Sequence, residues 1–548
     1  MFRKSWMLGV AAVFGTVLWF ALLAERPLFD PDEGRYAEIP REMLSGGDWV
    51  IPHLNALVYL EKPPLQYWLT ALAFRSFGQN EFAARLCTGL AGYLTLATVF
   101  FLGRRLWGIE AGVRALLLVS ASTLFVLLGH QLTLDMLLSF FLTAALGCFL
   151  MAQARRDSLQ ASRAWMLCCW AAMALAVLTK GLIGALIPAA ALSVYLVWQR
   201  DWMLLRRLNL RWGLPLFAAI AAPWFVLAAR ANPQFLRFFF VREHFQRFLT
   251  PIEHRTQPWW FFVPVLVVAI MPWLPQATRA LIAPFTERAP RGQFDAVRLL
   301  WIWCVFVLIF FSCSDSKLIP YILPAVPALA LLCASRKAGQ AFGSLLAGAL
   351  LSLASCAALL VYASGRWSNS FEARELLVLI RPMIFCTSIL LGAGALVSAV
   401  CVLRGRPLAA LASLCASWFL ASGTILAAAS SAQAEFSAKD VALALRLKAA
   451  SADFAHVPIF AVQSYQQSLV FYLQRPVVLV DYRDEFDLGL TLDPERGIAT
   501  LGQFADVWLS SSEGFAVMPP MTRDRLSALG VPIHEIARFP DRVIISRR

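Results

Sequence analysis

Charged residues of both signs gather in one short loop, residues 25–82, that follows the first long apolar run of the chain. The residues that stand out are Asp30, Asp32, Glu33, Arg35, Arg41, Glu42, Glu61 and Lys62. Only 15% of the chain is charged, so this density is unusual. A carboxylate can act as a general base or hold a metal ion, and Lys or Arg can hold a phosphate. Charges beside long apolar segments are costly unless they pair or bind a polar substrate, so we expect the chemistry of the protein here.

Two aspartates are the candidate reactive carboxylates. Asp32 lies in the loop just described, and Asp135 ends a polar stretch that interrupts two apolar runs. Asp32 could instead supply the anion that starts a helix over Glu33–Leu44, and Asp135 could cap the helix that follows it. We predict that both aspartates face the same surface and act on the substrate. Asp30, which a proline follows, fits a helix cap better.

Lysine is rare in this chain, and its positions are informative. Only seven of the 48 basic residues are Lys, and Lys62, Lys180 and Lys317 fall at the predicted outward ends of apolar segments, where positive charge is disfavoured. A Lys ammonium acts as a point charge for phosphate, so these three are candidate phosphate ligands. For Lys180 the alternative of a side chain that snorkels at a helix end has equal weight. Lys317 and Tyr321 are four residues apart, so on one helix both would face the same cavity.

A metal site is the weaker hypothesis for the same region. Glu61 and His244 carry the carboxylate and imidazole groups that suit zinc or manganese. Two ligands far apart in the sequence form a weak signal, and His254 is an equal candidate for the imidazole. The eleven cysteines form neither a Cys-x-x-Cys cluster nor a disulfide framework. The sequence therefore leaves open whether a divalent metal is a cofactor.

The rest of the chain consists of the elements that must position these residues. The 548 residues are 59% hydrophobic with a mean hydropathy of +0.65, well above the roughly 45–50% apolar content of soluble domains. We predict a polytopic α-helical membrane protein with about thirteen transmembrane helices, each near the ~20 residues that a bilayer requires. The predicted spans are residues 5–24, 83–103, 112–130, 134–153, 164–179, 181–198, 212–229, 259–278, 297–313, 318–335, 340–363, 383–403 and 407–429.

Basic residues recur in short groups at one set of span ends, as the positive-inside rule describes. The groups are Arg3–Lys4, Arg104–Arg105, Arg155–Arg156, Arg206–Arg207, Arg336–Lys337 and Arg404 with Arg406. This pattern places the N-terminus in the cytoplasm, and the odd number of spans places the C-terminal segment on the opposite side. The net charge of +14 therefore reflects membrane topology, and nucleic acid is not an expected partner.

Two domains follow from this topology. Residues 1–429 form the membrane domain, with outward loops at 25–82 and 230–258, and residues 430–548 form a small soluble α/β domain. In the first loop, short interfacial helices are predicted at Pro40–Ser45 and Leu65–Phe77. The soluble domain has predicted strands at 457–462, 477–480, 507–510 and 543–546, and predicted helices at 468–473 and 522–529. It has no Gly-rich phosphate loop and no nucleophile elbow, so we assign it no catalysis.

The candidate residues resemble those of a known family. The motifs are Asp32-Glu-x-Arg35-Tyr36, Tyr59-x-Glu61-Lys62-Pro-Pro, Asp135, Arg242-Glu-His244 with Arg247, and Ser316-Lys-Leu-x-x-Tyr321. They resemble the membrane glycosyltransferases of the GT-C fold. The C-terminal pattern Tyr465-x-Gln-Ser-Leu and Val480-Asp-Tyr-Arg-Asp-Glu485 is most similar to the 4-amino-4-deoxy-L-arabinose lipid A transferases, which are related to protein O-mannosyltransferases. The resemblance covers nearly the whole chain, including the number of spans.

The resemblance implies a reaction and a role for each residue. The donor would be a sugar on undecaprenyl phosphate, and the acceptor a lipid A phosphate at the periplasmic face of the bacterial inner membrane, with polymyxin resistance as the result. Lys62 and Arg247 would hold the donor phosphate with Arg35 and Tyr321 beside it, and Asp32 and Asp135 would face the sugar or the acceptor. Glu61 and His244 would form the metal site. Tyr59 and Lys317 complete the predicted substrate-binding residues. The residues themselves do not identify the sugar.

Three alternatives remain beside this interpretation. The enzyme could transfer another sugar to a protein hydroxyl or to another glycolipid. A transporter or flippase for a lipid-linked sugar would place polar residues near the bilayer midplane and often has repeated halves, whereas here the polar residues gather at one face without a repeat. A structural envelope protein would leave the charged first loop unexplained. The sequence therefore favours the enzyme.

Overall fold

The contacts of the chain divide it into two compact units. The structure, a computed structural model, describes residues 13–154, 158–250, 255–286, 294–335, 342–365, 371–431, 433–448, 454 and 456–547. The first unit comprises Met1–Leu23, Glu61–Gln66 and Arg85–Ala428, and the second comprises Ala24–Leu60, Tyr67–Ala84 and Ala429–Arg548. Most of the loop 25–82, which was predicted to belong to the membrane domain, is therefore grouped with the C-terminal segment.

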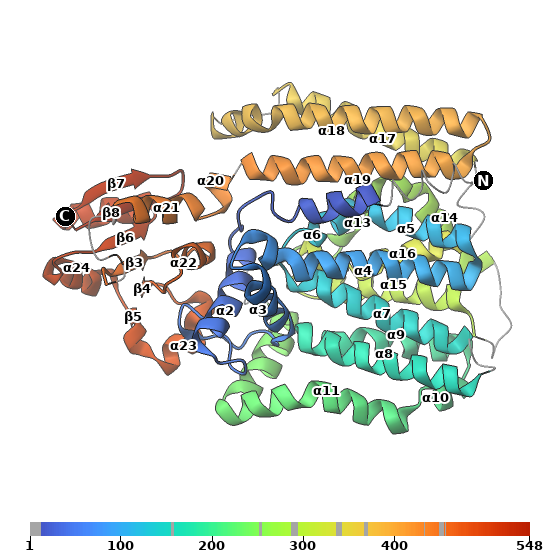
Figure 1. Ribbon diagram of the computed structural model, residues 1–548, viewed down its shortest axis with the longest axis horizontal. Helices are drawn as coiled ribbons and strands as arrows, with labels where there is room; N and C mark the ends of the chain where they lie inside the picture. The colour runs from blue at the N-terminus through green and yellow to red at the C-terminus, as the bar shows by residue number, and fades with distance from the viewer. Residues whose placement is uncertain are drawn as a thin grey trace. The chain divides into compact units, whose positions relative to one another are not determined.

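The first unit consists of helices, many of which run side by side (Figure 1). Besides a helical stretch at 13–21, its larger helices are α4 (Glu81–Trp107), α5 (Ile109–Ser120), α6 (Thr123–Gly129), α7 (Leu134–Ala154), α8 (Leu159–Lys180), α9 (Ile183–Gln199), α11 (Leu210–Ala231), α13 (Phe262–Ala269), α14 (Leu274–Thr286), α15 (Ala296–Ser312), α16 (Ala325–Ala334), α17 (Phe342–Ala363), α18 (Phe371–Leu403) and α19 (Pro407–Ser431). Short helical segments are α10 (Met203–Arg207), η1 (Arg237–Gln246), α12 (Arg247–Leu249), η3 (Met271–Trp273) and η4 (Ile319–Ile322).

Length and composition make many of these helices able to cross a membrane. Within the described residues, seven helices are long and apolar enough, and the number rises to nine if each of two bent pairs is one span. Three shorter apolar helices fall in ranges that were also predicted as spans, Ile183–Gln199, Ala296–Ser312 and Ile319–Ala334. The polytopic helical class is confirmed. The count of about thirteen stays a prediction, because residues 1–12 and several connections lie outside the described part of the chain.

Two predicted spans are bent rather than straight. The span predicted at 112–130 is divided into α5 and α6, which meet at 71°, and the Ser122 side chain accepts a hydrogen bond from Phe125 N at the start of α6. The span predicted at 259–278 is divided at Met271–Trp273 with a bend of 81°. Hydropathy registers apolar length but not direction, so neither bend could be predicted from it.

A predicted loop between two spans is mostly helical. Residues 364–382 lie between the spans predicted at 340–363 and 383–403, but α18 begins at Phe371 and continues through Pro382. Arg381 and Pro382 interrupt the apolar residues of this helix, which is why the sequence placed the start of the span too late. A proline inside a helix removes one backbone hydrogen bond but does not have to end the helix.

The second unit contains most of the first loop, together with the C-terminal segment. The loop forms α2 (Asp32–Gly46), a small hairpin of β1 (His53–Leu54) and β2 (Leu57–Val58), and α3 (Leu65–Phe77). The helix predicted at Pro40–Ser45 is thus the end of a longer helix, and the one at Leu65–Phe77 has the predicted bounds. The Asn55 side chain exchanges two hydrogen bonds with the backbone of Val477, at 2.9 and 2.8 Å, so the hairpin is attached to the C-terminal segment.

The C-terminal segment forms a six-stranded sheet with helices, which confirms the predicted α/β fold. The strand order is β5-β4-β3-β6-β8-β7, with β3, β4, β5 and β6 parallel and β7 and β8 antiparallel to their neighbours. The strands are β3 (Ile459–Val462), β4 (Val478–Val480), β5 (Gly497–Ile498), β6 (Phe515–Met518), β7 (His534–Arg538) and β8 (Val543–Ser546). The helical segments are α20 (Gln433–Phe436), α21 (Lys439–Lys448), α22 (Gln467–Leu473), η7 (Asp484–Phe486), α23 (Asp487–Leu492), η8 (Pro494–Arg496), α24 (Leu501–Ser510) and α25 (Pro520–Ala528).

One predicted strand of this segment is wrong. Residues 507–510 form the last turn of α24. Phe504 and Trp508 lie one helical turn apart and are both fully buried in the core of the sheet, so the apolar residues follow a helical period. Thr500 caps the helix, since its side chain accepts a hydrogen bond from Gln503 N at 3.3 Å. A short apolar run does not by itself distinguish a strand from a helix.

The cap of α24 gives a local test of this correction. We expect Thr500→Ala to weaken α24 by about 1 kcal/mol, because an orphan backbone amide loses its acceptor. Hydrogen exchange measured by mass spectrometry should then be faster in peptides that cover residues 501–510. Ser510→Ala, at the exposed other end of the helix, is the control and should not change exchange in the first turn. Unchanged protection in Thr500→Ala would contradict the capping role.

Candidate functional site

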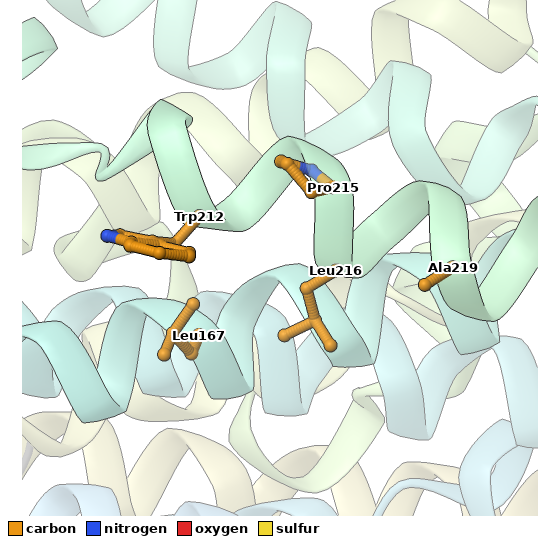
Figure 2. A pocket seen from close by; sticks show the side chains of 5 residues that line it. All are labelled: Leu167, Trp212, Pro215, Leu216 and Ala219. Carbon is orange, nitrogen blue, oxygen red and sulfur yellow. The ribbon is translucent and has the colours of Figure 1, made fainter.

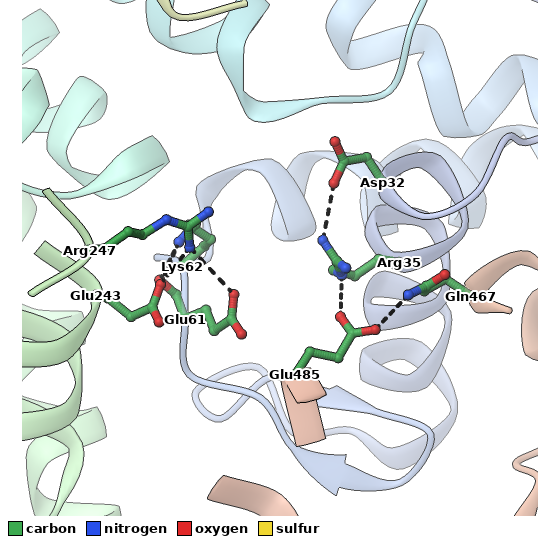
Figure 3. A network of polar contacts seen from close by, with 8 residues as sticks. All are labelled: Asp32, Arg35, Glu61, Lys62, Glu243, Arg247, Gln467 and Glu485. Atoms are coloured by element: carbon green, nitrogen blue, oxygen red, sulfur yellow. Dashed lines mark hydrogen bonds and ion pairs between the residues drawn. The ribbon is translucent and has the colours of Figure 1, made fainter. Parts of the chain in front are cut away.

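In the first unit, Lys62 and Arg247 share one carboxylate (Figure 3). Lys62 Nζ and Arg247 Nη1 each lie 2.9 Å from Glu243 Oε2, and Arg247 Nη1 lies 4.0 Å from Glu61 Oε2. Lys62 precedes two prolines, which disfavour a helix at that position. Glu243 and Arg247 are four residues apart on consecutive helical turns, so both reach the same point. Two cations therefore converge on one buried anion.

The charge of Glu243 depends on these two partners. Burial alone would raise the pKa of the Glu243 carboxyl, but the nearby Lys62 and Arg247 lower the pKa to about 2. Glu243 is thus ionised at every physiological pH. The side chains of Lys62 and Arg247 keep 13% and 16% exposure, so an anionic ligand can approach them. This arrangement suits a phosphate that competes with Glu243 for the two cations.

A second cluster of the first unit joins Asp135, Lys180 and Tyr321. Lys180 is the last residue of α8, and its Nζ lies 2.5 Å from Oδ1 of Asp135 in the first turn of α7. The same ammonium lies 4.8 Å from the centre of the Tyr321 ring, a distance at which a cation and an aromatic face attract. This ion pair is neither of the two roles predicted for Lys180, a phosphate ligand or a side chain that snorkels at a helix end, and both of those stay predictions.

Lys317 is placed differently from the prediction. It lies before η4, in a non-helical stretch, so the four-residue spacing does not put Lys317 and Tyr321 on one helical face. Its side chain is 7% exposed and donates a hydrogen bond to the carbonyl of Ser314, and its backbone amide donates to the carbonyl of Arg255. The sequence argument failed because Pro320 and the polar residues before it delay the helix.

In the second unit, Arg35 lies between two carboxylates (Figure 3). Arg35 Nε lies 2.5 Å from Glu485 Oε2, and Arg35 Nη1 lies 3.0 Å from Asp32 Oδ1. Gln467 Nε2 donates to Glu485 Oε1 at 2.6 Å, which fixes the carboxylate. Burial would lower the pKa of the Arg35 guanidinium, but Glu485, Tyr59 and Asp32 raise it, so Arg35 stays charged. Asp32 remains 41% exposed and can meet a ligand.

The predicted site residues therefore form three local groups. Lys62 meets Arg247 through Glu243, Asp135 meets Tyr321 through Lys180, and Asp32 meets Arg35 directly. Tyr59 is buried and close enough to act on the charge of Arg35. The shared surface of Asp32 and Asp135 joins residues of different units and stays a prediction. The sequence predicted no role for three residues of these groups, Glu243, Glu485 and Gln467. The four-residue spacing of Glu243 and Arg247 could have indicated the role of Glu243, whereas no local pattern links Glu485 to Arg35.

Glu61, one of the two residues proposed for a metal, already faces a cation. The Arg247 guanidinium lies 4.0 Å from the Glu61 carboxylate, and the Lys62 ammonium donates to the backbone carbonyl of Glu61, so two positive charges lie near this residue. A divalent cation would be repelled there unless several ligands compensated. Among the described residues, no group of three His, Cys, Asp or Glu side chains could hold a metal ion. The side chain of His244 and all of His254 lie outside the described part of the chain.

A separate pocket on the first unit is lined by uncharged side chains. It has a volume of about 410 Å³ and is lined by Leu167, Trp212, Pro215, Leu216 and Ala219 of α8 and α11 (Figure 2). None of these side chains titrates or carries charge. Such a surface suits an acyl chain rather than a reacting phosphate, so the pocket is not part of the candidate site.

Comparison with known proteins identifies the family. Residues 446–547 match the aminoarabinose transferase C-terminal domain, and residues 61–226 match the dolichyl-phosphate-mannose-protein mannosyltransferase family. An undecaprenyl phosphate-alpha-4-amino-4-deoxy-L-arabinose arabinosyl transferase of Sodalis glossinidius is 34% identical over 388 residues, which are 67% of each chain. The crystal structure of ArnT from Cupriavidus metallidurans bound to undecaprenyl phosphate superposes with a TM-score of 0.90 at 32% identity, over 100% of this chain and 98% of that one. The chain belongs to the aminoarabinose transferase family.

Further relatives agree with this assignment. The relative from Pseudomonas aeruginosa is 36% identical over 60% of this chain and 59% of its own length, and the one from Erwinia tasmaniensis is 34% identical over 63% and 62%. The matched part of this chain thus spans less than two thirds of these two relatives. The ArnT structure from C. metallidurans in the apo state has a TM-score of 0.89 at 31% identity. Membership in this family makes the chain a multi-span membrane protein with a GT-C fold and removes the transporter and structural-protein alternatives.

The pair of Asp135 and Lys180 allows a stability test of the second cluster. We expect Lys180→Met to lower the unfolding free energy by about 3 kcal/mol, because Asp135 then loses its partner in poorly solvated surroundings. The double variant Lys180→Met with Asp135→Leu should recover most of this loss. Thermal unfolding of the detergent-solubilised protein measures both.

A matched exposed pair is the control for this cycle. Arg483 and Asp487 form an ion pair at 3.1 Å, with 61% and 45% of their side chains exposed. Arg483→Met should cost about 1 kcal/mol or less, since exposed pairs contribute little. If Lys180→Met lowered the unfolding free energy no more than Arg483→Met does, the ion pair of Lys180 with Asp135 would not contribute to stability.

Proposed function

We propose that the protein transfers 4-amino-4-deoxy-L-arabinose from undecaprenyl phosphate to a phosphate of lipid A. The names of its relatives supply the sugar and the donor lipid, and the C. metallidurans relative has been crystallised with undecaprenyl phosphate bound. The observation in this chain that carries the proposal is the convergence of Lys62 and Arg247 on one carboxylate, at 2.9 Å each. That geometry is what two cations need to hold a phosphate between them.

The reaction is a displacement at the anomeric carbon of the sugar. The bond from this carbon to the donor phosphate oxygen breaks, a bond to an acceptor phosphate oxygen forms, and undecaprenyl phosphate leaves with the electron pair. Negative charge grows on the leaving phosphate, where Lys62 and Arg247 stabilise it. The anomeric carbon becomes cation-like, as in glycoside hydrolysis, so the carboxylates of Asp32 and Asp135 favour the transition state.

The acceptor decides whether a base is needed. A lipid A phosphate is already anionic, so no proton has to be removed before it attacks. A protein hydroxyl would need a general base, for which Asp32, 41% exposed, is the candidate. Asp32 therefore has an electrostatic role with a phosphate acceptor and an additional proton-transfer role with a hydroxyl acceptor.

The proposed location is the bacterial inner membrane, with the N-terminus in the cytoplasm and the C-terminal segment in the periplasm. The support is the distribution of Arg and Lys in short groups at one set of ends of the spans predicted from the sequence. Both substrates are lipids, so an active site at the membrane boundary can receive them without extracting their chains. Modified lipid A carries less negative charge, and resistance to polymyxin is the expected consequence.

Lipid A composition tests the proposal directly. Mass spectrometry of lipid A from cells with the protein should show an added aminopentose that is absent without it. Lys62→Ala should reduce the rate by about 10²–10³-fold, because the leaving phosphate loses one cation. Asp32→Asn should be milder than the ~10²–10⁴-fold loss expected when a general base is removed, since a phosphate acceptor needs none.

An exposed lysine provides the matched control for this experiment. Lys439 pairs with Glu81 at 2.6 Å but keeps 47% of its side chain exposed, so Lys439→Ala should transfer at the wild-type rate. Lipid A without an added aminopentose, in cells that contain the protein and its donor lipid, would refute the acceptor. Periplasmic proteins and other glycolipids would then be analysed for the sugar.

We further propose that catalysis needs no divalent metal. The support is the position of Arg247 beside Glu61, together with the two cations already available for the phosphate. Treatment of the purified protein with EDTA should leave the transfer rate unchanged. The control is the same preparation with zinc or manganese added back. Loss of activity with EDTA, restored by zinc or manganese but not by magnesium, would contradict the proposal and favour a site at Glu61 and His244.

A further inference from the structure

Helix α2, which carries Asp32 and Arg35, packs backbone against backbone on the C-terminal segment. A Cβ atom added at Gly34 would lie 2.2 Å from Ser468 N and 2.5 Å from the carbonyl carbon of Gln467. Both atoms belong to the backbone at the start of α22, which cannot shift as the end of a flexible side chain can. Gly34 is in regular helix, so the reason for a glycine here is space rather than backbone conformation.

The same point is fixed by hydrogen bonds to Asp30. Ser468 N donates to Asp30 Oδ1 at 2.5 Å, and Ser468 Oγ donates to Oδ2 at 2.9 Å. The hydroxyl of Ser468 also accepts a hydrogen bond from Ala438 N at 2.9 Å, so three segments of the second unit meet there. The sequence suggested that Asp30 caps α2, but α2 has no side-chain cap, and the Asp30 carboxylate binds Ser468 instead.

The residues that make these contacts lie on both sides, in sequence, of residues proposed to act in the transfer. Asp30 lies two residues before Asp32, and Gly34 lies directly before Arg35. Arg35 in turn binds Glu485, which is held by Gln467, the residue before Ser468. A displacement of α22 would thus be transmitted to Asp32 and Arg35 through both the backbone and the side chains.

We propose that Gly34, Asp30 and Ser468 are positioning residues, through which the C-terminal segment sets where Asp32 and Arg35 meet the substrate. This inference rests on the proposed function. It gives the C-terminal segment a role in the reaction without any reactive group of its own. The close approach at Gly34 sets the distance between α2 and α22, and the two hydrogen bonds to Asp30 set their register.

Two glycines of α2 provide a matched pair for the test. Gly34→Ala should lower kcat by about 10²-fold, the typical cost of a displacement near 1 Å in an active site. The KM for undecaprenyl phosphate-linked aminoarabinose should rise by a smaller factor than kcat falls, because Arg35 is only beside the donor phosphate, whereas Lys62 and Arg247, which hold it, belong to the other unit. Gly46→Ala adds the same methyl group to the last residue of α2, where no atom beyond the adjoining residues and the backbone of α2 itself lies within 4 Å, and should behave as wild type. The assay uses the full-length protein in lipid nanodiscs with lipid A as acceptor.

A second pair of variants keeps the inference testable if Gly34→Ala does not fold. Asp30→Ala removes both acceptors of Ser468 and should lower kcat, whereas Asp30→Asn retains an acceptor for Ser468 N and should restore much of it. A purely structural role would reduce the yield of folded protein but leave kcat and KM per folded enzyme unchanged, and this result would overturn the inference. So would a Gly34→Ala enzyme with the kcat of Gly46→Ala.

Failure of the proposed function can be distinguished from failure of the inference. If wild-type protein transfers no sugar to lipid A, the proposed function fails, and the variants are compared by hydrogen exchange instead. Faster exchange of residues 32–38 in Gly34→Ala and Asp30→Ala, but not in Gly46→Ala, would then support the positioning contact. Equal exchange in all three variants would overturn it.

Discussion

Pairing of basic side chains with carboxylates, in surroundings that solvate charge poorly, is the constraint on which the candidate site depends. Lys62 and Arg247 share Glu243, Lys180 pairs with Asp135, and Arg35 pairs with Glu485. A buried charge without a partner is expensive, so each cation is held in one place before a ligand arrives. The same requirement limits which ligands can bind. A ligand that displaces one of these carboxylates must itself supply the negative charge that the cation loses.

The second unit extends this principle to the packing of α2. Arg26 and Arg41 each bind a fully buried glutamate, Glu33 and Glu38, on the same helix. With these charges satisfied locally, the helix can pack a glycine directly on the backbone of α22. Backbone contacts as close as this one are poorly compressible, so α2 and α22 cannot shift gradually against each other. The C-terminal segment can therefore influence the position of Asp32 without contributing a reactive group.

What could be predicted from the sequence was determined by local pattern. Apolar length predicted most helices, and crowded charge together with family motifs singled out Asp32, Arg35, Lys62 and Arg247. The failures arise where the deciding contact is distant: Val507–Ser510 is helical because Trp508 completes a buried face, and Arg35 is bound by Glu485, 450 residues further along the chain. The placement of Lys317 failed because a helical spacing was assumed before η4 begins.

The low pKa of Glu243 has a consequence for the proposed reaction. Because the pKa is about 2, protonation cannot release Lys62 and Arg247 at physiological pH, so release must come from competition with phosphate. The donor is a phosphodiester with one negative charge, whereas the leaving undecaprenyl phosphate is a monoester with about 1.5 to 2. The phosphate therefore competes with Glu243 more strongly as its bond to the sugar breaks. The two cations gain more from the departing phosphate than from the intact donor, and an interaction that strengthens toward the transition state accelerates the chemical step.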